Sequence, residues 1–291
     1  MADDALARRN PATLPKLVTP RQVSLRAVGV VVGIELIAGV AWALSHSTWL
    51  GIAALFGGIV AWSYRRRAEL HTALTHTERA HELLDLGNTE QAEQLLDALL
   101  ASRRTPANIK PFAAYYRALA AMRRGHYTEA RARLQGVIDS GWLGNRRALQ
   151  PRAPVIYASA MVAAVLDGDL EAADRWRAEG QRSPANLERH WFVADAFALA
   201  RREEWTALLQ LLDRHWEAIE GTISGVGIRQ LQLLRAFALT RLHQHEDNYR
   251  GLYSGEEIDA LLHGIRPGRF DYLASNWPAL REFMASRHLL A

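Results

Sequence analysis

Two long apolar runs dominate the hydrophobic pattern near the start of the chain. Residues 27–44 contain one charged side chain, Glu35, and residues 48–64 contain none. Each run, as a helix rising about 1.5 Å per residue, is close to the ~30 Å thickness of a bilayer core. Only residues 45–47 join the runs. The pattern therefore predicts a transmembrane helical hairpin. The alternatives are two helices buried in the core of a soluble protein, or a signal peptide cleaved near Ala41.

The placement of arginine predicts how this hairpin is oriented. Arg21 and Arg26 precede the first run, Arg65–Arg67 follow the second, and the short loop carries no formal charge. Basic flanks of membrane spans stay on the cytoplasmic side. We therefore expect both spans in the inner membrane of the cell and both termini in the cytoplasm.

Three residues of the first run suggest contacts inside the membrane. Gly29 and Gly33 form a G-x-x-x-G pair, which lets helices approach closely in lipid. Glu35 lies mid-span, where a carboxylate is costly and marks a candidate functional position. The glycine pair is expected to pack the hairpin against itself or against another subunit. Glu35 is expected to make a structural or subunit contact, with proton or ion chemistry as the alternative.

Beyond residue 67 the apolar positions follow helical spacing, and short turns interrupt them. One element recurs, as Gly87-Asn-Thr-Glu-Gln-Ala92, Gly125-His-Tyr-Thr-Glu-Ala130 and Gly168-Asp-Leu-Glu-Ala-Ala173. The glycine is expected to end one helix in a left-handed conformation. The alanine is expected on the next helix, where two helices cross closely.

This element resembles the turn of the tetratricopeptide repeat (TPR) family. Residues 111–139 are the best copy, and its consensus-like positions are Tyr116, Ala118, Gly125, Tyr127, Ala130 and Leu134. The glycine spacings of 38 and 43 exceed the ~34 of that family. A fourth turn near Glu203 lacks glycine, and a fifth helix pair is expected near 225–243 and 255–264. The chain thus predicts an all-α, TPR-like α-solenoid of four to five helix pairs, capped by Pro278–Leu290.

The resemblance also implies where a partner would bind, because TPR proteins usually hold peptides in the concave groove lined by their first helices. The implied positions are Phe112, Tyr115, Leu119, Met122 and Arg123 in the second repeat, and Val155, Ala158, Val162 and Val165 in the third. The alternative at each position is ordinary packing between helices. The clamp that some members use for C-terminal carboxylates is not expected, since tyrosines replace its polar residues.

Charge and motif content narrow the function. Residues 1–67 hold eight basic and three acidic side chains, whereas the remaining 224 hold 27 and 28, so the excess positive charge flanks the predicted membrane spans. We therefore expect no nucleic-acid partner. Without cysteine, HExxH or a phosphate-binding loop, we expect neither an enzyme nor a bound metal or cofactor.

Three segments follow, namely a flexible 1–22, an anchor over 23–67 and a repeat domain over 68–291. The anchor-plus-repeat order loosely resembles bacterial two-span repeat proteins. We expect a membrane-anchored scaffold that binds protein partners, within a membrane complex. The alternative is a small structural subunit of an intramembrane transport or energy complex, with Glu35 in or near its pathway. Residues 59–86 lack glycine and proline, which predicts one continuous helix over about 49–86.

Overall fold

The computed structural model describes residues 17–45, 48–144, 149–183, 187–220, 223–245 and 255–291. This part of the chain is all-helical and contains no strand, which confirms the predicted fold class at that level. Its α-helices are α1 Pro20–Ser45, α2 Thr48–Leu86, α3 Thr89–Ala101, α4 Lys110–Arg123, α5 Tyr127–Asp139, α6 Ala153–Asp167, α7 Leu170–Gln181, α8 Phe192–Arg201, α9 Trp205–Glu220, α10 Gly225–His245, α11 Gly255–Leu262 and α12 Pro278–Ser286. Four short 3-10 helices accompany them, η3 Trp142–Gly144, η4 Gln150–Arg152, η5 Glu188–His190 and η7 Asp271–Ala274.

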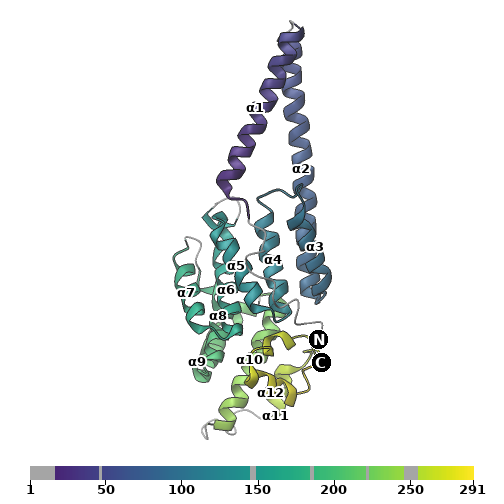
Figure 1. Ribbon diagram of the computed structural model, residues 1–291. Coiled ribbons are helices and arrows are strands. Elements are labelled where there is room, and N and C mark those ends of the chain that lie inside the picture. Colours follow the sequence, from purple (N-terminus) through teal and green to yellow (C-terminus); the bar gives the residue numbers. More distant parts are fainter. Residues whose placement is uncertain (1–16, 46–47, 145–148, 184–186, 221–222, 246–254) are drawn as a thin grey trace.

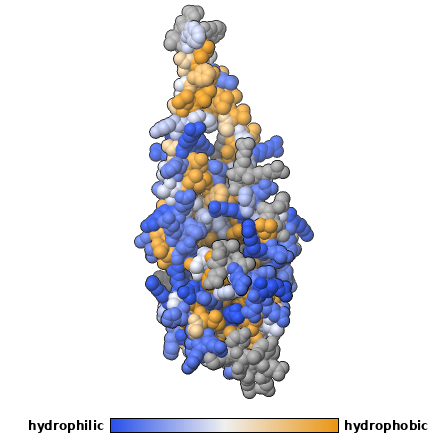
Figure 2. Space-filling model, turned by 180° about the vertical axis from the view of Figure 1, so that it is seen from behind, coloured by the Kyte–Doolittle hydropathy of each residue, from blue (hydrophilic) through white to orange (hydrophobic). Residues whose placement is uncertain are grey.

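Helices α1 and α2 project from the other helices as an antiparallel pair (Figure 1). Their contact includes Ala38, which is buried, and Ile34, whose Cγ2 lies 3.3 Å from where a Cβ on Gly58 would stand. Hydrophobic side chains gather toward the narrow end of the molecule, and the body below it is mainly hydrophilic (Figure 2). Within the described residues, one helix is long and apolar enough to cross a membrane by length and composition, over Pro20–Val40. The second apolar run reaches Arg65 after 17 residues.

Helix α2 runs without a break from Thr48 to Leu86, over 39 residues. This confirms the continuous helix that the composition of residues 59–86 predicts. At about 1.5 Å per residue its length is about 58 Å. The segment boundary predicted at 67/68 therefore falls within one helix. Glu69 accepts a hydrogen bond from Arg65 at 3.2 Å, one turn away on the same face.

The start of α1 rests on the helical body. The Trp142 indole Nε1 donates a hydrogen bond of 2.7 Å to the Val18 carbonyl, and Leu17 packs against the main hydrophobic core. Pro20–Gln22 already belong to α1. Residues 17–22 of the segment predicted as flexible are thus tied to the body, and residues 1–16 lie outside the described part of the chain.

Four helix pairs share one turn geometry. At Gly87 the φ angle is 89°, the glycine N–H donates to Leu84 O, and the next N–H donates to Leu83 O. Gly125 and Gly168 repeat this pattern with φ angles of 76° and 88°. This is the Schellman motif, which closes a helix through a left-handed residue. The fourth turn has the same hydrogen bonds although Glu203, with φ 61°, replaces the glycine.

The turns join α2 to α3, α4 to α5, α6 to α7 and α8 to α9, and each of these pairs packs side by side. Five residues after each turn residue stands a side chain with no exposed surface: Ala92, Ala130, Ala173 and, in the fourth pair, Leu208. The predicted close crossing is therefore present in the first three pairs. A fifth pair, α10 and α11, agrees closely with the predicted ranges.

The C-terminal segment 266–277 crosses back over these turns. The Arg269 guanidinium donates to Asp85 O, beside Gly87. Ser275 lies against Gly125, where a Cβ would approach its Oγ to 2.6 Å. Asn276 donates from Nδ2 to Asp167 Oδ1 at 3.3 Å and accepts from Arg201 at its carbonyl. One segment thus ties the ends of four successive helix pairs together.

Candidate functional site

A groove opens between the first helices of the second, third and fourth pairs and the C-terminal segment. We call it the inner groove. Its walls come from α4, α6 and α8, and η5, the start of α10 and η7 close it. The lining residues are Tyr115, Leu119, Met122, Arg123, Val155, Ala158, Ser159, Val162, Leu166, His190, Val193, Ala194, Phe197, Ile223, Ser224, Val226, Gly227, Gln230, Tyr272 and Leu273.

Seven of the nine residues that the TPR resemblance places in a groove lie together here: Tyr115, Leu119, Met122, Arg123, Val155, Ala158 and Val162. Phe112 lies outside the groove, half-buried, with the Arg152 guanidinium 5.3 Å from its ring centroid. Val165 is fully buried in the core, and its neighbour Leu166 lines the groove instead. The helical spacing from Val162 points to Leu166, four residues on, as well as to Val165.

Tyr115, together with Ser159, contributes hydroxyl groups to the wall of the inner groove. Its hydroxyl lies 3.2 Å from Ser159 Oγ, and Ser159 in turn donates to the Val155 carbonyl at 2.8 Å. Since the serine hydrogen is used on that carbonyl, Tyr115 is the donor of the pair. Burial raises the pKa of Tyr115 to about 12, so its hydroxyl stays neutral across the physiological range. This residue presents an aromatic face and a satisfied hydroxyl to the groove.

Arg123 lines the groove, but its charge is already engaged. Its guanidinium donates to the Leu84 carbonyl and to Asp85 Oδ1, the latter at 3.3 Å. Both acceptors lie at the carboxyl end of α2, where a cation is favourable because of the helix dipole. We therefore assign Arg123 a structural contact in addition to its place in the wall.

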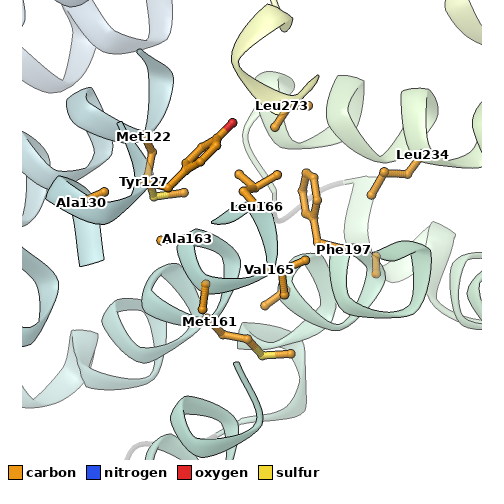
Figure 3. Packing of buried hydrophobic residues seen from close by; sticks show 14 of the residues in the cluster. Met122, Tyr127, Ala130, Met161, Ala163, Val165, Leu166, Phe197, Leu234 and Leu273 are labelled. Carbon is orange, nitrogen blue, oxygen red and sulfur yellow. The ribbon is translucent and has the colours of Figure 1, made fainter. Parts of the chain in front are cut away.

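The opposite wall comes from parts of the chain where the repeat pattern is weak. Gln230 Nε2 donates to the Tyr272 hydroxyl at 2.6 Å, which fixes η7 against α10. Phe197 of α8 and Leu273 of η7 lie beside Leu166 of α6 (Figure 3). His190 Nδ1 is buried without a hydrogen-bond partner, and burial, followed by nearby Arg189, lowers the pKa of this histidine. The imidazole is consequently neutral at pH 7.

The chemistry of the inner groove is therefore that of an apolar surface with a few neutral polar groups. Leucine, valine, methionine and phenylalanine side chains form most of it, and Ser159, Ser224, His190 and Gln230 supply hydrogen-bonding atoms. Arg123, the one cation of the lining, is engaged by acceptors at the carboxyl end of α2. Such a surface favours an uncharged, mainly apolar segment, because burying an unpaired charge there would be costly.

Sequence reasoning missed the residues contributed by η5, α8, α10 and η7. No local motif marks them, since they come from the region where the turn glycine is lost and from the C-terminal segment. The only usable signal was the apolar helical spacing of Val193 and Phe197, four residues apart on α8. That spacing gives no indication of which other helix they face.

Of the three anchor residues singled out by sequence, Gly29 and Glu35 lie on the outer side of the α1–α2 pair and Gly33 is half-buried. Glu35 and Gly29 are exposed, and no atom stands within 4 Å of a Cβ built at Gly29 or Gly33. The two glycines therefore do not pack α1 against α2, so the predicted packing of the hairpin against itself through this pair is wrong. Contacts of α1 with α2 involve Ile34, Ala38 and Gly58 instead.

No family model, curated protein or solved structure matches the chain.

Proposed function

We propose that this protein is a membrane-anchored scaffold whose helical domain, a TPR-like solenoid, binds a protein partner in the inner groove. In this proposal α1 and the first part of α2 cross the inner membrane as a hairpin. Both termini and the helical domain lie in the cytoplasm. The role is binding and not catalysis, it requires no cofactor or metal, and nucleic acid is not a partner.

The inner groove is the observation that carries the proposal. It is an apolar surface on the face where repeat proteins of this kind hold their partners, and Val155 in its wall keeps 38% of its surface exposed. One exposed valine is ordinary, but a concave surface of adjoining apolar side chains is typical of a binding site. The shared Schellman turns and the buried alanines support the resemblance to TPR proteins.

The exposed apolar side chains of α1 and α2 support the membrane anchor. Leu36, Ile37 and Phe56 each expose more than three-fifths of their surface. A soluble protein rarely exposes so large a continuous apolar surface. The arginines that bracket the two runs support cytoplasmic termini.

Photo-crosslinking in intact cells tests the groove. A photo-reactive phenylalanine analogue replaces Val155 in the full chain, and the same analogue replaces Leu74 as a control. Leu74 has nearly the same exposure, 41%, but lies on α2 outside the groove. We expect a discrete crosslinked product from position 155 and none from position 74.

A second substitution links that product to the groove surface. Val162→Asp places a charge on the half-buried wall and should abolish the product from position 155, with the helical content unchanged by circular dichroism. Equal products from both positions, or a product that survives Val162→Asp, would show that the partner binds elsewhere.

The position of Glu35 favours one alternative. An exposed carboxylate in the middle of a span is costly in lipid and requires cover from another helix or from a polar pathway. The protein would then be a small structural subunit of a transport or energy complex. Glu35→Gln keeps the shape and hydrogen bonding but removes ionisation. Loss of function in an intact complex would favour this alternative, and full function would favour the scaffold.

A further inference from the structure

The loops at the hairpin end of the helical domain have an unusual charge. Residues 102–110 contain Arg103, Arg104 and Lys110, and residues 140–152 contain three arginines, with no acidic residue in either segment. The turns at the opposite ends of the helices are mixed in charge, because residues 123–126 and 201–204 contain two arginines each. Residues 85–90 and 167–171 carry only acidic charges, two and three respectively. The helical domain is thus basic at one end although its net charge is close to zero.

Contacts with α2 place Arg104, and with it the neighbouring Arg103, close to the point where this helix leaves the apolar run. Ser102, Arg104 and Thr105 line one depression together with Ala68, Glu69 and Thr72 of α2. Positions 68 to 72 lie only about 2–8 Å along the helix axis from Arg67. In the proposed orientation this is the headgroup layer, which extends several ångströms beyond each side of the hydrocarbon core.

The described part of the second loop, residues 140–144 and 149–152, lies at the other foot of the hairpin. Trp142 holds Val18 there, two residues before α1 begins. The first loop therefore stands under α2 and the described part of the second under α1, and both face the side from which the hairpin projects (Figure 1).

Arg103 and Arg104 are the side chains available for binding at this end. Both are exposed, and neither is paired with a carboxylate within the described residues. The other two cations in the described parts of these loops are occupied, because Lys110 Nζ donates to the Leu100 carbonyl and Arg152 to the Tyr116 hydroxyl. Arg67 on α2 is exposed as well, whereas Arg65 and Arg66 share Glu69.

We propose that Arg103 and Arg104 bind the phosphate groups of anionic phospholipids at the cytoplasmic surface. Guanidinium groups suit this ligand because they donate paired hydrogen bonds to phosphate oxygens. This inference rests on the proposed membrane anchor. The loop between α3 and α4 becomes a second attachment of the helical domain to the bilayer, about one helix diameter from α2, and it limits tilting of the domain.

The test uses the full chain, purified in micelles that contain equal amounts of phosphatidylglycerol and phosphatidylcholine. The lipid retained by the protein is quantified after removal of free micelles. The wild-type protein should retain more phosphatidylglycerol than phosphatidylcholine at about 0.1 M salt, and less of this preference at about 1 M, where the screening length falls to ~3 Å. The variant R103E/R104E should lower the preference about fivefold or more, since each basic residue near such a surface contributes roughly that factor.

The matched control is R266E/R281E, which makes the same charge change at exposed arginines of the C-terminal part of the domain. It should retain the wild-type preference. An equal loss in both double variants would indicate a general charge effect and overturn the proposed site. An unchanged preference in R103E/R104E would overturn it too.

The membrane anchor is tested separately, on the cell membranes from which the protein is purified. If the chain stays in the membrane fraction after a carbonate wash but shows no lipid preference, the lipid site fails and the anchor stands. If the wash releases the chain, the anchor itself fails, and this inference fails with it.

Discussion

At the scale of single residues, the left-handed turn position decides how each helix pair is closed. Gly87, Gly125 and Gly168 occupy it at no steric cost, because they have no Cβ. Glu203 adopts the same conformation with φ 61° and forms the same two hydrogen bonds. The geometry is therefore imposed by the packing of α8 and α9, and the fourth turn stores strain that the first three do not.

Glu203→Gly should consequently stabilise the protein. A left-handed non-glycine residue costs about 1–2 kcal/mol, and glycine returns about 0.5–1 kcal/mol of that through the entropy of the unfolded chain. We expect a net gain of about 0.5–1 kcal/mol in the free energy of unfolding. Chemical denaturation of the full chain in micelles, followed by circular dichroism, measures this change.

Gly168→Ala is the control with the opposite sign. Its φ of 88° disfavours any side chain, and the nearest obstacle, the Arg201 guanidinium at 3.1 Å, sits at the end of a flexible side chain. A loss of about 1 kcal/mol is expected. Stabilities unchanged by either substitution would mean that turn conformation does not contribute to the measured transition.

A second residue-scale feature is the carboxylate of Asp195 on α8. Burial raises its pKa to about 6, against the lowering influence of Arg177, whose Nη2 lies 2.9 Å from Oδ2. In the unfolded chain this group titrates near 3.8. Between these values the folded protein retains a proton that the unfolded chain has released. Rising pH therefore removes stability through this window, and the loss is complete above about pH 6.

Asp195→Asn should abolish that pH dependence. Between pH 4 and 6, the melting temperature of the wild type relative to the variant should fall as the pH rises. Above pH 7 the difference between the two melting temperatures should stay constant. Asp259→Asn, at an exposed carboxylate paired with Arg287, is the control and should leave the wild-type profile in place. A wild-type profile that is parallel to that of Asp195→Asn throughout would contradict the raised pKa.

At the scale of elements, α2 is the part that joins the two halves of the molecule. Its first part belongs to the apolar hairpin and its last part packs against α3 and α4. Alanine, leucine, arginine and glutamate through its middle favour a helix, and a flexible linker would need glycine, serine or proline. The helical domain is therefore held at a fixed rotation relative to the hairpin.

Inserting two alanines after Ala68 tests this rigid connection. Two residues rotate everything beyond them by about 200° on a helix and should separate Trp142 from Val18. We expect loss of the crosslinked product from position 155. A seven-residue insertion, which leaves a residual rotation of only about 20°, is the control and should retain more of the product. Undiminished crosslinking with two inserted residues would indicate a flexible connection.

At the scale of the whole molecule, the protein has an apolar hairpin at one end and a helical domain whose turns are tied by the C-terminal segment at the other. The basic loops lie between them. This arrangement gives three surfaces with different chemistry, an apolar one on the hairpin, a basic one at its feet and the neutral inner groove. Their order along one axis supports the proposed orientation in a membrane.

Labelling of introduced cysteines tests that orientation, because the chain contains none of its own. His46→Cys, between the two runs, should react with a membrane-impermeant maleimide in intact spheroplasts. Arg281→Cys, exposed on α12, should react only after the membrane is opened. Equal reactivity of both positions before permeabilisation would exclude the hairpin topology.

The sequence by itself determined the local structure of this protein. Helical spacing gave the helix pairs, the glycines gave three turns, and uninterrupted helix formers gave the full length of α2, because these features depend on neighbours within a few residues. The wall residues on α4 and α6 were implied by the resemblance to the TPR family.

Only the tertiary structure decided what faces what. Arg123 is engaged by the end of α2, Glu35 faces away from α2, and Tyr272 and Leu273 return from the C-terminal segment to close the inner groove. These contacts join positions 38 to more than 150 residues apart, so no periodicity along the chain encodes them. They arise where separate helices bury their remaining apolar surface together, and that packing determines which side chains stay free to bind a partner.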